Sequence, residues 1–109
     1  MTDAITHRGF FGDGEQAFAL TDNMVAELER KTGKGIAAIH QQLLGMAFSA
    51  ELLREIIRLG LIGAGASPEK AMQLCGTYAT NRPMAELFPL AFEILEARWN
   101  GATAEEVAA

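Results

Sequence analysis

The glycines at positions 60, 63 and 65 have the spacing in this chain that most resembles a binding motif. Closely spaced glycines followed by a helix start at Ser67 could form a loop whose backbone N–H groups cradle a phosphate. That chemistry requires either the order GxGxxG after a buried strand or a Walker loop ending in Gly-Lys-Ser/Thr. Here the order is GxxGxG, and Lys70 lies too far downstream.

The segment before these glycines, LLREIIRLGL, predicts a helix, because its apolar residues recur with the helical period. We therefore interpret the glycines as a helix C-terminus followed by a tight, close-packed turn. Anion binding at the N-terminus of the next helix stays open as an alternative, on an argument that applies to any helix N-terminus.

The other reactive side chains form no recognisable site. His7 and His40 each lack a second metal ligand at i+3 or i+4, and His40 is expected at the surface or its boundary. Cys75 is the single cysteine, so no intrachain disulfide can form, and we expect it to be a small buried hydrophobe. The sequence predicts no catalytic residue, no cofactor site and no metal site, and so no enzyme.

The composition is typical of a single globular domain. The chain has 109 residues, of which 50% are hydrophobic and 21% charged, with a net charge of −5. Binding to nucleic acid is disfavoured, because only nine lysines and arginines are present. No apolar stretch approaches the ~20 residues of a membrane span. We see no secretory signal, and we expect a cytoplasmic protein.

The acidic side chains of the predicted helices are expected to lie on solvated faces. Glu27 is placed to pair with Lys31 at i,i+4. Glu93 and Glu96 are interpreted in the same way, as surface charges that need no acid–base role.

Residues 5–20 predict a β-hairpin with Asp13-Gly14 as its two-residue loop, since glycine accepts positive φ at no steric cost. That loop pairs Phe11 with Gln16. Neighbouring side chains on a strand point to opposite faces, so only one of Phe10 and Phe11 can enter a core on one side of the hairpin. The two predicted faces carry His7, Phe11, Phe18 and Leu20 on one side and Arg8, Phe10, Glu15 and Ala17 on the other.

About five short helices follow the hairpin. Thr21, Ser49 and Ser67 are expected N-caps, and Gly33 is expected to end the first helix. The second runs from about 34 to 46, and the last from about 83 to 101, either beginning or kinking at Pro89. The residues expected to face inward are Met24, Val25, Leu28, Ile36, Ile39, Leu43, Met46, Leu52, Leu53, Ile56, Ile57, Leu61, Ala71, Met72, Cys75, Tyr78, Phe88, Phe92, Leu95 and Trp99.

The predicted fold is therefore mainly α with a small N-terminal β-hairpin, in the α+β class. We expect residues 1–101 to form one compact helical domain and residues 102–109 to form a frayed tail.

Three aromatic residues are the predicted partner-binding residues: Phe10, Phe11 and Trp99. The phenylalanine that the hairpin leaves outside the core is the better candidate, because an exposed aromatic on a two-stranded edge supports strand addition or hydrophobic docking. Trp99 ends the aromatic stripe of the last helix, where it serves either the core or an interface.

Four segments, taken in order, resemble the small tail protein of gene transfer agents and related tailed phages. They are HRGFFGDGEQAFALT, MVAELERKTGKG, LLREIIRLGLIGAGASPEKA and RPMAELFPLAFEILEARWNG. The resemblance covers roughly residues 7–101, and the order and spacing of the segments carry it. Members of this family are described either as tail-tube-associated proteins or as tail assembly chaperones.

The resemblance implies a non-enzymatic role in building a phage-like tail, and it offers no catalytic residues. We expect a tail assembly chaperone of a gene transfer agent or prophage, which shields a tape-measure or tail-tube client through hydrophobic contacts. A homo-oligomer is open, and neither nucleic acid nor a membrane is an expected partner. The alternatives are a structural tail component retained in the particle, an unrelated small adaptor or regulator, and an enzyme that uses Cys75.

Overall fold

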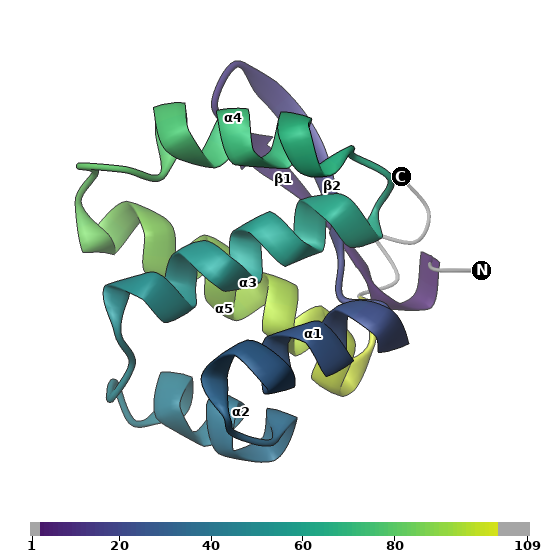
Figure 1. The fold of residues 1–109 in the computed structure, drawn as a ribbon, viewed down its shortest axis with the longest axis vertical. Helices are drawn as coiled ribbons and strands as arrows, with labels where there is room; N and C mark the ends of the chain where they lie inside the picture. Colours follow the sequence, from purple (N-terminus) through teal and green to yellow (C-terminus); the bar gives the residue numbers. More distant parts are fainter. Residues whose placement is uncertain (1–2, 103–109) are drawn as a thin grey trace.

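A computed structural model describes residues 3–102, which form five α-helices and one antiparallel hairpin (Figure 1). The predicted class, mainly α with an N-terminal hairpin, is confirmed. The predicted tail lies outside the described residues from position 103 onward. After a short 3₁₀ turn, Asp3–Ile5, the elements are β1 Thr6–Phe11, β2 Gly14–Ala19, α1 Asp22–Thr32, α2 Ile36–Leu44, α3 Ala50–Gly63, α4 Pro68–Tyr78 and α5 Met84–Asn100.

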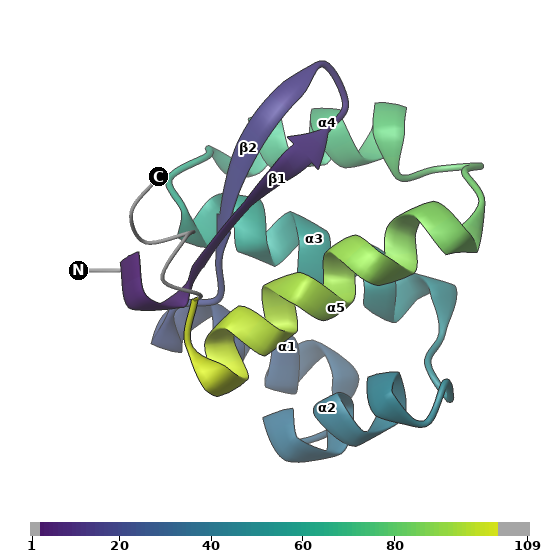
Figure 2. The same ribbon diagram turned by 180° about the vertical axis from the view of Figure 1, so that it is seen from behind.

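Helix α3 is the central element, because β2, α1, α4 and α5 all pack against it. Figure 1 shows α3 crossing the middle of the molecule, and Figure 2 shows α5 and β1 together on the opposite side. Its buried side chains cover more than half of the circumference of the helix, and Glu51, Arg54, Glu55 and Arg58 lie on the remaining face. The buried side chains of α3 are Leu52, Leu53, Ile56, Ile57, Leu59 and Leu61.

The predicted helix boundaries follow from local capping. Thr21, Ser49 and Ser67 each accept a hydrogen bond from the backbone N–H three residues later, at distances of 3.0–3.4 Å. Each bond satisfies one of the N–H groups that a helix start leaves without an intrahelical partner. Gly33 ends α1 in the left-handed conformation, with φ of 71°. These expectations are confirmed.

Two methionines expected to face inward are exposed instead. Helix α2 ends at Leu44, so Met46 lies in the connection, with φ of 56°, and is 65% exposed. In α4 the buried residues are Ala71, Leu74 and Cys75, so Leu74 faces the core where Met72 was expected. Met72 is 68% exposed. The prediction for Met46 was wrong because the helix ends before it, and that for Met72 was wrong because the inward face of α4 lies on the side of Leu74.

Helix α5 begins at Met84 and continues through Pro89. The sequence left open whether the helix begins or kinks at Pro89, and the structure shows that it does not begin there. Pro89 removes the hydrogen bond to the carbonyl of Ala85, and that residue is exposed, so water can replace the missing donor.

The hairpin loop is Gly12-Asp13, one position earlier than predicted. Phe11 pairs with Gly14, and the predicted pairing with Gln16 was wrong. Gly12 has φ of 73°, which suits the first loop position of a type II′ turn. A Cβ at Gly12 would also lie 2.5 Å from the Tyr78 ring. The correction shifts each cross-strand partner by two residues, so the predicted faces of the sheet are unchanged.

The glycines of the 60–65 segment allow β2 to lie directly on α3. A Cβ at Gly63 would overlap the carbonyl oxygen of Ala19, and one at Gly60 would lie 3.1 Å from the Cβ of Phe18. Gly65 follows the helix with φ of 117°. The interpretation as a helix end with a close-packed turn is confirmed, and the need for close approach explains why glycine stands at these positions.

We predict that Gly63→Ala lowers the free energy of unfolding by about 1–3 kcal/mol, because its methyl group would push β2 away from α3. Gly76→Ala in α4 is the matched control. Gly76 faces open space, so the same change should raise stability by about 0.5–1 kcal/mol. Urea unfolding followed by circular dichroism measures both. Equal effects of the two substitutions would contradict the close contact at Gly63.

Candidate docking surfaces

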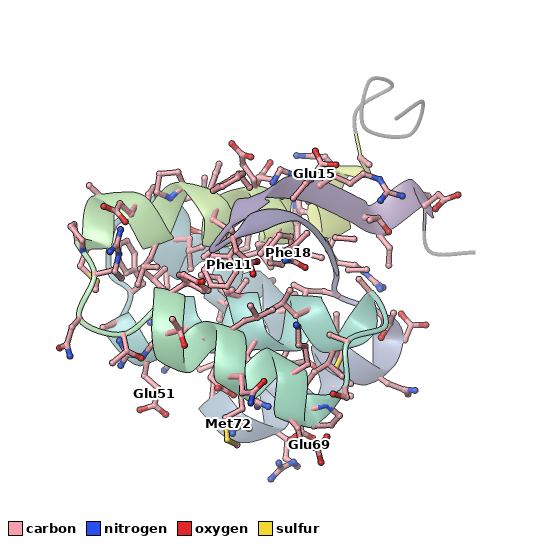
Figure 3. All side chains as sticks on the ribbon, turned by 90° about the horizontal axis from the view of Figure 1, so that it is seen from above. Phe11, Glu15, Phe18, Glu51, Glu69 and Met72 are labelled. Atoms are coloured by element: carbon pink, nitrogen blue, oxygen red, sulfur yellow. The ribbon has the colours of Figure 1, made fainter. Side chains whose placement is uncertain are left out.

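Phe10 and Phe11 lie on opposite faces of β1, as the alternation of the strand requires. Phe11 is 6% exposed and makes edge-on contacts with the rings of Phe18 and Tyr78, each with centroids 6.1 Å apart. Figure 3 shows Phe11 and Phe18 pointing from the hairpin towards the helices. Phe10 is 76% exposed on the outer face. Phe11 is thus a core residue, and Phe10 is the phenylalanine left available to a partner.

A groove of about 340 Å³ runs beside Phe10 at the tip of the hairpin. Its walls come from β1, from the end of α4 and from the first half of α5. Arg82 and Glu86 close one side as an ion pair, with 2.9 Å between the guanidinium nitrogen and the carboxylate oxygen. The lining residues are Phe10, Phe11, Gly12, Tyr78, Arg82, Glu86, Leu87 and Leu90.

A second groove, of about 510 Å³, lies between the beginning of β1 and the end of α5. His7 on β1 and Glu93 on α5 meet there, with 3.1 Å between Nε2 and Oε2. Arg8 lines the same groove from the outer face of the strand and is exposed. Because β1 and α5 run antiparallel, the two grooves follow one another along the same border between strand and helix.

Trp99 on α5 is 47% exposed, so the expectation that it faces inward was wrong. Its ring stacks on the ring of His40 of α2, with centroids 4.3 Å apart. His40 also pairs with the Glu96 carboxylate. His40 is 7% exposed, so the expectation of a surface or boundary residue was wrong. Glu96 is likewise a partly buried partner of His40 rather than a free surface charge. These partners are 56 residues apart, and no local spacing signals the contact.

Phe10 and Trp99 do not form one surface. Leu90, which lines the groove beside Phe10, is nine residues before Trp99 on α5. Nine residues correspond to about two and a half helical turns, so the two side chains leave the helix on opposite sides. Both aromatics are exposed, and partner binding by either of them stays a prediction. The sequence contained no signal for their separation.

Charged residues on α1 and α3 form a separate network. Glu55 lies between Arg58 and Lys31, and the hydrogen bonds from Arg58 hold the pKa of its carboxyl below the usual value. Lys31 therefore pairs across to α3, and the predicted pair with Glu27 was wrong. Glu27 instead accepts from Arg30, whose hydrogen bond lowers the pKa of the Glu27 carboxyl. The network joins two helices, and none of its residues lines either of the two grooves.

Cys75 is a buried side chain on the inner side of α4, as expected. Burial raises the pKa of its thiol to about 11. Such a thiol carries little thiolate at neutral pH and is a poor nucleophile.

Within residues 3–102, no three histidine, cysteine, aspartate or glutamate side chains gather closely enough to hold a metal ion. In the same part of the chain, no helix combines the length and apolar character needed to cross a bilayer.

A family model described as phage tail tube protein, GTA-gp10, matches residues 4–101. The chain belongs to this GTA-gp10 family. The predicted membership in a gene transfer agent family of phage tail proteins is confirmed, and the match covers the whole hairpin and all five described helices. Among curated proteins and among solved structures, none matches the chain significantly. The family assigns the protein to phage-like tails, where its partners are other tail proteins.

For this GTA-gp10 family member we predict that Phe11→Ala lowers the free energy of unfolding by about 3–5 kcal/mol, because it empties a buried aromatic site. Phe10→Ala, one residue earlier, should change it by less than about 0.5 kcal/mol, because that ring is exposed. Chemical unfolding of the two variants measures the difference. A larger loss for Phe10→Ala would reverse the assignment of the two faces.

We also predict that the Cys75 thiol reacts about a hundredfold more slowly in the folded protein than in the unfolded chain at about pH 8. The reason is the upward displacement of its pKa from 9.0 to about 11. A chromogenic disulfide reagent measures both rates. In the folded protein the rate should still rise tenfold per pH unit up to about pH 10, and a plateau near 9 would contradict the burial of the thiol.

Proposed function

We propose that this GTA-gp10 family member is a tail assembly chaperone, which holds a tape-measure or tail-tube protein through hydrophobic contacts before the tail is complete. The observation that carries this proposal is Phe10. Its ring is 76% exposed on the outer face of the hairpin and lines a groove that apolar residues of β1, α4 and α5 also line. Large apolar groups held in water in this way are typical of binding surfaces.

The rest of the apolar surface supports reversible binding of an extended client. Exposed apolar side chains are distributed over the hairpin, the end of α2, the α2–α3 connection, α4 and α5. Several are methionines, which adapt to irregular partners. Such dispersed contacts suit a long client that has not yet folded into its final assembly. These side chains are Phe10, Leu44, Met46, Met72, Met84 and Trp99.

The acidic character of the chain supports the same role. A net charge of −5 keeps a complex dispersed while its apolar groups are engaged. A non-enzymatic role in the cytoplasm is part of the proposal. The non-enzymatic part of the proposal is supported by the family and by the burial of Cys75, the candidate nucleophile of the enzyme alternative.

A second candidate is a structural component that remains in the finished tail. The family description favours it, since the matching model is described as a phage tail tube protein. A tube subunit repeats one contact many times around and along the tail, whereas a chaperone leaves when the subunits assemble.

We predict that Phe10→Ala reduces capture of the tape-measure or tail-tube protein about tenfold, the loss expected when one central aromatic contact is removed. Tagged protein is recovered from cells that produce particles, and the tail proteins bound to it are quantified by mass spectrometry. Gln73→Ala on α4 is the control, because it shortens an exposed polar side chain that belongs neither to the groove lining nor to the exposed apolar residues. Capture that is unchanged by Phe10→Ala would contradict a client site on the hairpin.

A further inference from the structure

The outer face of the hairpin carries an aromatic ring beside two opposite charges. Phe10 is 76% exposed on this face. Arg8 lies two residues earlier on β1, so its side chain leaves the strand on the same side as Phe10. Glu15 on β2 is the direct cross-strand partner of Phe10 and shares that side as well. Figure 3 shows Glu15 on the side of the hairpin away from Phe11 and Phe18.

Both charges are available to a partner. Arg8 and Glu15 are exposed, and neither forms an ion pair with any residue in the described range 3–102. They are diagonal neighbours on the two strands, about 7–8 Å apart. Arg8 differs in this respect from the arginines that pair with a carboxylate inside the molecule. Those are Arg30, Arg58, Arg82 and Arg98.

The arrangement of these three side chains is complementary to itself. A two-fold axis can lie between two such faces, perpendicular to the diagonal from Arg8 to Glu15 and through its midpoint. Each arginine then meets the glutamate of the other copy. Phe10 lies close to this axis, because it is about 7 Å from Arg8 along the strand and about 5 Å from Glu15 across it. The two phenylalanine rings therefore meet beside the axis, in the space of about 10 Å that separates sheets packed face to face.

We propose that this chain forms a two-fold dimer through the outer faces of two hairpins. The two Phe10 rings exclude water at the centre, and two Arg8–Glu15 ion pairs between the copies flank them. The charges favour a second copy as the occupant. A partner of one sign would place a like charge against one of the two side chains, whereas a second copy satisfies both. A two-fold interface also closes on itself, so association stops at two copies.

The size of the surface makes this dimer weak. Each strand has six residues, so the outer face is about 20 Å long and about 10 Å wide. That is well below the roughly 800 Å² per partner of a standard stable interface. The dimer therefore exchanges with single chains and forms at high protein concentration.

The dimer also has a consequence for binding. It covers Phe10, so a client that needs this ring competes with the second copy. The inference goes beyond the proposed function and stands for a chaperone and for a tail component alike, because it concerns the chain without a client.

Sedimentation equilibrium of the purified full chain tests the proposal, at protein concentrations from about 1 μM to about 1 mM. We expect the mass to rise from that of one chain towards that of two. Arg8→Glu or Glu15→Arg alone places like charges opposite one another twice in the dimer, so each should raise the dissociation constant at least about tenfold. Lys34→Glu is the matched control, because it reverses an exposed charge between α1 and α2 with the same change in net charge as Arg8→Glu. It should leave the dissociation constant unchanged.

A mixture of the two single variants gives the sharpest result. An Arg8→Glu chain presents two anions on the face and a Glu15→Arg chain presents two cations. One copy of each therefore restores both ion pairs. The equimolar mixture should dimerise about as tightly as the unchanged chain, while each variant alone stays a single chain over the same concentrations. No client is present in these measurements, so their failure is distinct from a failure of the proposed function.

Three results would overturn the proposal. The first is a chain that remains a single copy at about 1 mM, or a dimer that neither charge reversal weakens. The second is a mixture that associates no more tightly than the separate variants, which would contradict the pairing of Arg8 with Glu15 between copies. The third is a mass that grows beyond two copies, which would contradict the two-fold arrangement.

Discussion

The structure depends on the close approach of β2 to helix α3. Two glycines on one side of α3, Gly60 and Gly63, bring the backbone of the hairpin onto the helix, and this contact seats Phe18 in the core. A two-stranded hairpin has too little surface to be stable alone, so it needs such a platform. Once β2 is in place, the alternation of side chains along the strands decides which of them face the core. Phe11 enters the core beside Phe18, and Phe10 is forced to the outer face.

The same constraint produces the surface on which function depends. With β2 held against α3, β1 becomes the outer strand, and α5 runs beside it. The protein therefore carries an exposed aromatic ring and two grooves along a single border. A tail protein of the GTA-gp10 family needs a surface for other tail proteins. Cys75 is buried, and both histidines pair with glutamates of α5.

Local chemistry made much of this fold predictable. Three hydroxyl caps, the left-handed glycine after α1 and the helical period before Gly60 depend on residues a few positions apart, and these predictions held. The loop position was missed because Gly12 and Gly14 both flank Asp13, and only the packing of Tyr78 on Gly12 distinguishes them. The pairs of His7 with Glu93 and His40 with Glu96 join distant elements, so no spacing in the sequence could reveal them.

The most direct test of the proposed chaperone role is the number of copies of this chain in purified mature particles, relative to the tail proteins, measured by quantitative mass spectrometry. The same ratio is measured in complexes recovered from cells during assembly. A chaperone is present with its client during assembly and is lost from the mature particle. A fixed stoichiometric number of copies in mature particles would contradict the chaperone role and establish a structural component of the tail.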